Sequence, residues 1–512
     1  MDPLVLYTIC SAYRLPIPED TIKMIRIPSQ TFGFFITVHR SQPLSKWPHD
    51  IHGCIGYWED KRMSKAAIIG KIPGIAHSSF FTDSRAQYHP IPLLEDPDAR
   101  IEISFMQLPL TPILGNRKTF DNEKYGLIVD SDQGRGTYLP KVFKTKNWGE
   151  ISASLLQKAR VKTGKFFQYE TSVVEGKLRT IFDREYLDWV AQEYLIFMEL
   201  NYGDFVPYMV EGGKVIIDKT ENVRNCATLC ELLDFPVSKN LRAKIRRDIK
   251  YYVAKWKNRN MGHSLISHSE ISEFRHYKFA KRIYTEQANA FLIMAIAKID
   301  GKVSQTLVDI CDDLYKNLDG MEHSLISHSE INEGSHYKFA ERIYMDPQFQ
   351  LGETLIGLHK VCPRIKELAH WQKWMEKRLE GLSNTIDNIF EYNWQAKYLF
   401  EIRKDIPAKT HAEELLRRLI GLKINNDMET NYLAVYFEAM MSLWGILGGE
   451  EIFRIILPVW IFLLQRWKNE LFSIKNSKSF YLFYFKNGTA RIDITGHVIN
   501  GLQVTNVKEK EK

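Results

Sequence analysis

The sequence is poor in cysteine for its length of 512 residues. Its six cysteines are Cys10, Cys54, Cys226, Cys230, Cys311 and Cys362. A small scaffold held by disulfides needs a much higher density, so this distribution excludes that class and indicates a reducing compartment. The N-terminus also lacks the basic segment followed by an apolar stretch that a secretory signal requires. We therefore expect an intracellular, cytoplasmic protein.

Long apolar runs are lacking as well. The longest is residues 455–464, which lies between Arg454 and Gln465. A helix that crosses a bilayer needs about 20 apolar residues. The sequence therefore predicts no membrane partner.

A strong excess of one charge is also missing. The chain has 69 Lys and Arg residues against 62 Asp and Glu residues, a net charge of +7, which is too small to indicate a nucleic-acid-binding protein by itself. The phosphate-binding loop, the Gly-x-Ser-x-Gly elbow, the His-Glu-x-x-His helix and the paired Cys-x₂-Cys motif are absent from the sequence. We predict no cofactor, and the motifs leave open whether the protein is an enzyme.

What the sequence contains is an ordinary globular composition, 45% hydrophobic and 26% charged, in a chain too long for one core. Strand-like runs such as 32–38 and 101–106 dominate the first part, and helical periodicity dominates the last. We predict an α+β N-terminal domain followed by a mainly α-helical C-terminal region. The predicted divisions are residues 1–190, a hairpin and basic helix at 191–260, a helical region at 261–475, and a hairpin with a charged tail at 476–512.

One short segment stands out as a candidate site. Residues 51–56 read Ile-His-Gly-Cys-Ile-Gly and follow a strand-like run. Gly53 and Gly56 lack a Cβ atom, so main chain or a ligand can approach Cys54 closely. We therefore predict that this thiol lies at a site.

The same segment begins a series of blocks that resembles the AMMECR family. The later blocks are Asp83-Ser84-Arg85 with Pro90, residues 101–105, residues 125–129, and residues 136–142 followed by Trp148 and a helix at 151–159. They occur in the family's order and at about its spacing over residues 15–190. The resemblance departs at His52, where the family usually has arginine, and at Lys141, where an acidic residue is usual.

The resemblance implies a fold of two small α+β subdomains that meet at a cleft. It also implies the residues that line this cleft. They are His52, Gly53, Cys54, Gly56, Asp83, Arg85, Tyr138 and Lys141. Such a cleft would bind or transform a small anionic metabolite, with Cys54 and His52 as the catalytic candidates. The alternative is a buried, inert cysteine packed between glycines, because a nucleophilic thiol needs a lowered pKa.

A strongly basic helix is predicted at residues 238–260, with nine Lys or Arg residues against one acidic residue, Asp248. Such a helix can bind nucleic acid or an acidic partner, and the residues placed for it are Arg242, Lys244, Arg246, Arg247 and Lys250. The alternative is a solvated face on a helix that packs through its apolar stripe. The second functional hypothesis is therefore a non-catalytic interaction or regulatory protein whose helical half binds protein or nucleic acid.

An internal repeat is the last unusual feature. Residues 261–284 and 321–344 agree at 19 positions and contain six of the 15 histidines. Identity this local indicates a partial duplication, because stacked structural repeats keep their apolar pattern and lose exact residues. The histidine spacing fits no common zinc motif, and Cys226 with Cys230 lacks a second ligand pair, so we predict no metal site.

Overall fold

The computed structural model describes residues 1–42, 50–89, 91–113, 120–142, 147–258, 288–300, 304–322, 356, 379–402, 406–471, 479–485 and 488–510. The chain forms two compact units, residues 1–186 and residues 187–512. Each unit is considered by itself. Most of the two repeated segments, and with them their histidines, lie outside the described residues.

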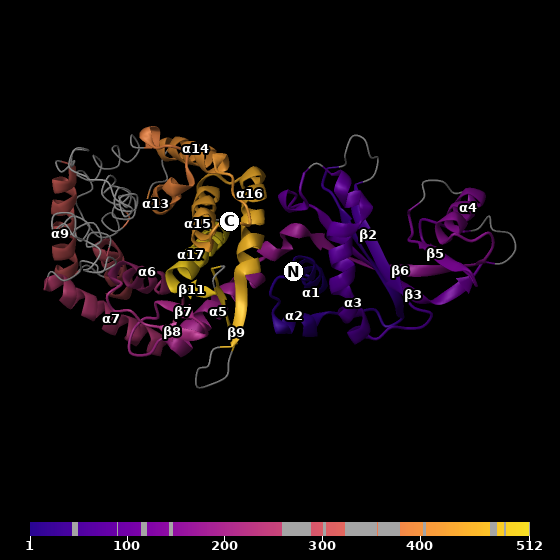
Figure 1. The fold of residues 1–512 in the computed structure, drawn as a ribbon, viewed down its shortest axis with the longest axis horizontal. Coiled ribbons are helices and arrows are strands. Elements are labelled where there is room, and N and C mark those ends of the chain that lie inside the picture. The colour runs from indigo at the N-terminus through magenta and orange to yellow at the C-terminus, as the bar shows by residue number, and fades with distance from the viewer. Residues whose placement is uncertain are drawn as a thin grey trace. The chain divides into compact units, whose positions relative to one another are not determined.

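The first unit is built on a six-stranded antiparallel sheet (Figure 1). Its strands are β1 (Thr31–His39), β2 (Ile51–Trp58), β3 (Arg100–Pro112), β4 (Gly126–Ser131), β5 (Gly134–Tyr138) and β6 (Lys165–Lys177). Their order is β2-β1-β3-β6-β4-β5, which places β2 at one edge. The β-branched and aromatic residues of 32–38 explain why β1, paired on both sides, is buried almost throughout.

Helices cover this sheet in two places. The helices α1 (Pro3–Tyr13) and α3 (Lys65–His77) contact β1, β3 and β6, and Val5 of α1 lies against Gly176. The helix α4 (Trp148–Ala159) packs on β4 and β5 around a separate cluster that includes Leu127, Val129 and Leu155. Both groups of helices pack on the same sheet. The prediction of an α+β N-terminal domain is confirmed.

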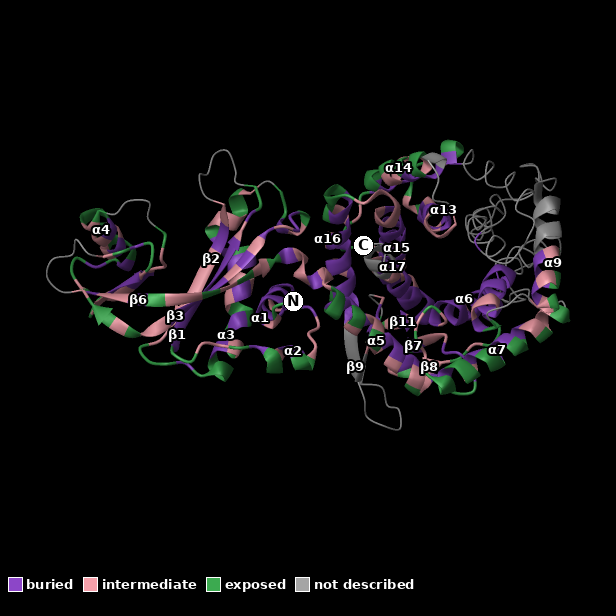
Figure 2. Ribbon diagram, turned by 180° about the vertical axis from the view of Figure 1, so that it is seen from behind, coloured by how far each residue is buried: buried purple, intermediate pink, exposed green. Residues whose placement is uncertain are grey.

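The second unit is mainly helical. Its helices include α5 (Arg184–Asn201), which begins in the first unit, and α6 (Asn222–Leu232), α7 (Lys239–Lys257), α9 (Gln305–Glu322), α13 (Ile389–Glu401), α14 (Ile406–Gly421), α15 (Thr430–Leu447), α16 (Glu450–Arg466) and α17 (Ile492–Lys510). Buried residues run along α15, α16 and α17 (Figure 2). In this core the ring of Phe437 stacks on Trp460 at 5.3 Å. The predicted helical C-terminal region is confirmed, and none of its described helices has the length and apolar character needed to cross a membrane.

The hairpin predicted between residues 210 and 218 is present. The strands β7 (Met209–Glu211) and β8 (Lys214–Ile216) pair across Gly212 and Gly213. Both glycines have positive φ, +55° and +72°, as a two-residue primed turn requires.

The chain near its C-terminus differs from the prediction of a hairpin and a charged tail. The strand β10 (Ser479–Phe483) pairs with β9 (Trp467–Leu471), and β11 (Thr489–Arg491) pairs with β7. The predicted hairpin is thus wrong beyond its turn, where Gly488 has a φ of +84°. The ring of Trp467 in β9 stacks on the ring of Phe483 in β10, with their centroids 5.9 Å apart. This apolar contact accompanies the pairing of β10 with the strand that precedes it in the sequence. Most of the expected tail is helix α17.

Two buried glutamates in the core of the second unit have contrasting surroundings. Glu438 of α15 accepts hydrogen bonds from Lys397 at 2.9 Å and from His497 at 2.7 Å. Burial would raise the pKa of Glu438, but these partners outweigh it and lower the pKa to about 2. Glu231 of α6 is only 5% exposed, and its Oε2 has no hydrogen-bond partner within the described structure. Burial therefore raises the pKa of Glu231 well above its ordinary value.

Replacing Glu231 with glutamine should stabilise the second unit at neutral pH. A carboxyl whose folded pKa is raised costs stability above its unfolded pKa, so the gain should be about 1–3 kcal/mol at pH 7 and disappear at pH values below about 4. The measurement is denaturant unfolding of wild type and Glu231→Gln at both pH values. A variant that is less stable at pH 7, or equally shifted at pH 4, would contradict the assignment of a neutral buried acid.

Candidate functional site

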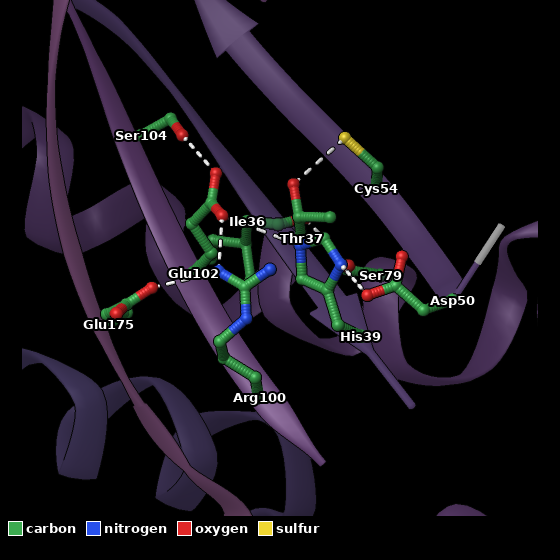
Figure 3. Close-up of polar contacts among 10 residues, drawn as sticks. All are labelled: Ile36, Thr37, His39, Asp50, Cys54, Ser79, Arg100, Glu102, Ser104 and Glu175. Atoms are coloured by element: carbon green, nitrogen blue, oxygen red, sulfur yellow. Dashed lines mark hydrogen bonds and ion pairs between the residues drawn. The ribbon is translucent and has the colours of Figure 1, made fainter. Parts of the chain in front are cut away.

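The candidate cysteine lies in the edge strand β2, opposite Thr37 of β1. Thr37 Oγ1 donates a hydrogen bond to the Sγ atom of Cys54 at 3.2 Å (Figure 3). The two side chains meet because this is a pair that exchanges no main-chain hydrogen bonds, where cross-strand side chains come closest. The main-chain N–H and C=O groups of Cys54 therefore point away from β1.

Side chains from the segment after α3 satisfy these outward-facing groups. The Cys54 N–H donates to Asp83 Oδ2 at 2.9 Å, and its carbonyl accepts from Arg85 Nη2 at 3.2 Å. Arg85 also donates to both carboxylate oxygens of Asp83, at 2.9 Å and 2.6 Å. Burial alone would raise the pKa of Asp83, but the hydrogen bonds from Arg85 and the Cys54 amide lower it to about 2. The carboxylate is thus a fixed part of this edge.

The two glycines beside Cys54 each allow a close approach. A Cβ atom on Gly53 would overlap the carbonyl oxygen of Ser79, and one on Gly56 would overlap the ring of Phe35. Ser79 itself is fixed because its hydroxyl donates to the Ile36 carbonyl at 2.8 Å (Figure 3). In both cases the close neighbour is the protein's own chain.

Two cations influence the thiol. Burial raises the pKa of Cys54, and the hydrogen bond from Thr37 and the positive charges of Arg85 and Lys158 only partly offset it. A thiol with a raised pKa is mostly protonated at neutral pH, which makes it a hydrogen-bond donor and a poor nucleophile.

Lys158, near the end of α4, is the cation that the sequence did not single out. Its Nζ donates to the Thr137 carbonyl at 2.8 Å and lies 4.4 Å from the ring centroid of Tyr138. Burial lowers the pKa of Lys158, the like charge of Arg85 lowers it further, and Cys54 acts in the opposite sense. In the described part of the chain no carboxylate pairs with it.

His52 is close to Cys54 in sequence but has other partners. Its ring accepts a hydrogen bond from Arg40 Nε at Nδ1, 3.2 Å away, so the proton lies on Nε2, which donates to the Phe80 carbonyl at 3.0 Å. Burial, helped by the charge of Arg40, lowers the pKa of His52 to about 4. The ring is neutral at physiological pH, and its contacts fix the segment after α3 to the sheet.

The other two predicted residues are placed differently. The hydroxyl of Tyr138 lies 3.1 Å from Ser154 Oγ on α4, and its ring faces Lys158. Lys141 is exposed, has a φ of +65°, and donates its N–H to the Asn122 carbonyl at 2.6 Å. Tyr138 therefore joins the site through Lys158, whereas none of the described contacts brings Lys141 to it.

A polar cluster next to Thr37 was missed at the sequence level. His39 lies between two carboxylates, with Nδ1 3.0 Å from Asp50 and Nε2 3.5 Å from Glu102 (Figure 3). The close approach of His39 is the main reason that the pKa of Glu102 is lowered to about 2. Glu102 is the β3 residue opposite Thr37, so it shares a face of the sheet with Cys54. The alternation of polar and apolar residues along β3 predicts which face of the sheet Glu102 occupies. It does not predict which residues of the adjacent strands lie beside Glu102.

No metal site emerges from the described residues, which contain no group of three or more His, Cys, Asp or Glu side chains that could hold an ion. Cys226 and Cys230 are both buried on α6.

The basic residues of α7 largely bind the protein's own carbonyl groups. Those that do so are Arg242 and Arg246 at Ile299, Lys244 at Tyr202, Arg247 at Gly203, and Lys255 at Lys219. The apolar stripe of Leu241, Ile245 and Ile249 is buried. These contacts hold five of the cations at nearby carbonyl groups, while Arg242, Arg246, Arg247 and Lys250 remain exposed.

Comparisons with known proteins agree with the resemblance of the first unit. Residues 9–175 match the model of the AMMECR1 family. A search of the curated proteins finds no match. Among solved structures, an uncharacterised protein from Pyrococcus horikoshii aligns at 20% identity over 33% of this chain and 89% of its own, with a TM-score of 0.24.

Other solved structures align over a larger share of the chain at lower identity. An unsaturated glucuronyl hydrolase specific for heparin aligns at 9% identity over 64% of this chain and 99% of its own, with a TM-score of 0.42. An unsaturated glucuronyl hydrolase from Streptococcus agalactiae aligns at 11% identity over 64% of this chain and 92% of its own, with a TM-score of 0.38.

Proposed function

We propose that the AMMECR1-type domain of this chain binds a small anionic ligand beside Cys54. Arg85 and Lys158 supply the positive charge, and the Thr37 and Cys54 side chains supply the nearby polar groups. The proposal assigns binding and leaves any reaction open. It keeps the metabolite site expected at Cys54, Asp83 and Arg85, and replaces Lys141 with Lys158.

The observation that carries this proposal is that the described contacts of Lys158 include no carboxylate. The residue as a whole is exposed, but its ammonium group is held at the Thr137 carbonyl, is partly desolvated there and is repelled by Arg85. A cation that is open to solvent on one side and has a neutral carbonyl as its described partner is expected to gain from a bound anion, which supplies a charged partner. Arg85 is well placed to share that anion, because its side chain is 38% exposed while Asp83 fixes its orientation.

Cys54 has a binding role in this proposal. Its pKa is raised, so the thiol can donate to an anion without competing with it as a second negative charge. His52 takes no part, because its ring is neutral and both nitrogens are used by Arg40 and Phe80.

Inorganic phosphate should protect Cys54 from alkylation at pH 9, with chloride at equal ionic strength as the reference. Replacing Lys158 with methionine should weaken the apparent phosphate affinity about tenfold, equivalent to about 1.4 kcal/mol. The rate is followed on the Cys54 peptide by mass spectrometry.

Lys141→Met is the matched control, because it removes an exposed cation from the same domain and should leave protection unchanged. Equal protection in wild type and Lys158→Met, or no protection by phosphate in wild type, would refute the proposed site.

A further inference from the structure

A cysteine and a lysine from distant parts of the chain meet in the second unit. Lys298, in the helical segment 288–300, places its Nζ atom 3.2 Å from Sγ of Cys230 in the last turn of α6. The same ammonium group donates to the Cys230 carbonyl at 3.1 Å and to Asp234 Oδ2 at 2.6 Å. Three acceptors therefore hold the nitrogen directly against the sulfur.

This pair is buried but lies just beneath the surface. Cys230 is 4% exposed, while the side chains of Lys298 and Asp234 are 19% and 28% exposed. The nearly buried sulfur therefore has two partly exposed side chains as neighbours. Burial would lower the pKa of Lys298, but the neighbouring Cys230 and Asp234 outweigh it and raise the pKa.

We propose that Cys230 and Lys298 form a reversible covalent cross-link when the protein is exposed to hydrogen peroxide. The amine of Lys298 lies 3.2 Å from this sulfur, and its hydrogen bonds to Asp234 and to the Cys230 carbonyl already position it. The bond would join α6 to the segment 288–300 and make the second unit sensitive to oxidation. It is a modification site separate from the anion site proposed around Cys54.

The chemistry balances in two steps. Peroxide first oxidises the thiol, and the products are a sulfenic acid and one water. The amine of Lys298 then attacks that sulfur, the S–O bond breaks, a second water leaves, and an S–N bond forms. The lysine ammonium must lose a proton, which passes to solvent beside Asp234. Peroxide is the only oxidant needed, and two electrons leave the Cys–Lys pair.

Peptide mass spectrometry after peroxide treatment of the full chain tests this proposal. The expected product is a linked pair of peptides containing Cys230 and Lys298, lighter by two hydrogens than their sum and separated again by a thiol reductant. The yield should increase from pH 7 to pH 9, since the attacking amine must be deprotonated.

One variant and one internal control keep the test decisive. Lys298→Arg retains a positive charge for Asp234 and should abolish the linked product, so that Cys230 proceeds to sulfinic acid instead. Cys226, one turn earlier on α6 and also buried, at 0% exposed against 4% for Cys230, should remain unlinked and serves as the internal control. Sulfinic acid at Cys230 in wild type without any linked product, or an equal yield of links at Cys226, would overturn the proposal.

Discussion

Alanine at position 53 should destabilise the first unit by about 3 kcal/mol. The added Cβ atom would overlap the Ser79 carbonyl oxygen and would lie 3.0 Å from the Ser79 carbonyl carbon and 3.1 Å from Asp83 Cβ. These neighbours are mostly main chain, and Ser79 is tied to Ile36 by a hydrogen bond. They cannot rotate away, so the whole segment that carries Asp83 and Arg85 would have to move.

Thermal and denaturant unfolding of the Gly53→Ala chain, read from signals of the first unit, would measure this cost. Gly70 provides the matched control because it lies in α3 and a Cβ atom there meets no heavy atom within 4 Å. Gly70→Ala should stabilise the helix by up to about 1 kcal/mol. Similar unfolding midpoints for the two variants would show that the approach of Ser79 to β2 is not as close as described.

The second large effect is expected at Lys397 in the helical unit. Lys397→Met removes the lysine partner of Glu438, which is buried and also accepts from Asn393 at 2.8 Å and lies 2.7 Å from His497. Leaving a buried carboxylate with too few partners typically costs about 3–5 kcal/mol. The variant should therefore unfold at a clearly lower denaturant concentration at pH 7.

The pH dependence of this effect has a defined sign. The pKa of Glu438 is lowered to about 2 in the folded protein, whereas an unfolded glutamate has a pKa of about 4.3. Its stabilisation is therefore complete above the unfolded pKa and is lost as the pH falls through about 2. The difference between wild type and Lys397→Met should shrink in acid.

The control for this prediction is an exposed ion pair. Arg417 pairs with Glu414 on the surface of α14, and Arg417→Met should change stability by less than about 0.5 kcal/mol at any pH. An equal loss in the two variants, or a loss for Lys397→Met that grows in acid, would contradict the assigned role of the buried pair.

Much of the fold follows from local patterns in the sequence. The enrichment of β1 in aromatic and β-branched residues, the Gly212-Gly213 turn and the periodicity of the late helices each depend on nearby residues. The pairing of β10 with β9 does not, because the apolar match of Trp467 with Phe483 is a tertiary contact. The hairpin predicted within residues 476–512 therefore did not form between β10 and β11, which pair with β9 and β7.

The candidate site divides in the same way. Asp83 and Arg85 were predicted from the family resemblance, and the structure brings both to Cys54. Lys158 was missed because on a helix its spacing resembles that of any solvated lysine, and only the packing of α4 against β5 brings its ammonium group to Thr137 and Tyr138. Thr37 and Glu102 were missed because the polar–apolar alternation within a strand predicts only the face of the sheet on which a side chain lies. The order and register of the strands decide which side chains lie together on that face.

The hydrogen bonds of Asp83 and Arg85 have a consequence for how the protein behaves at high concentration. An exposed outer strand normally offers free amide and carbonyl groups on which another polypeptide can add as a further strand. At Cys54 both groups are already occupied by side chains of the same molecule. This part of the sheet is therefore closed to templated self-association, and removal of Asp83 would open it.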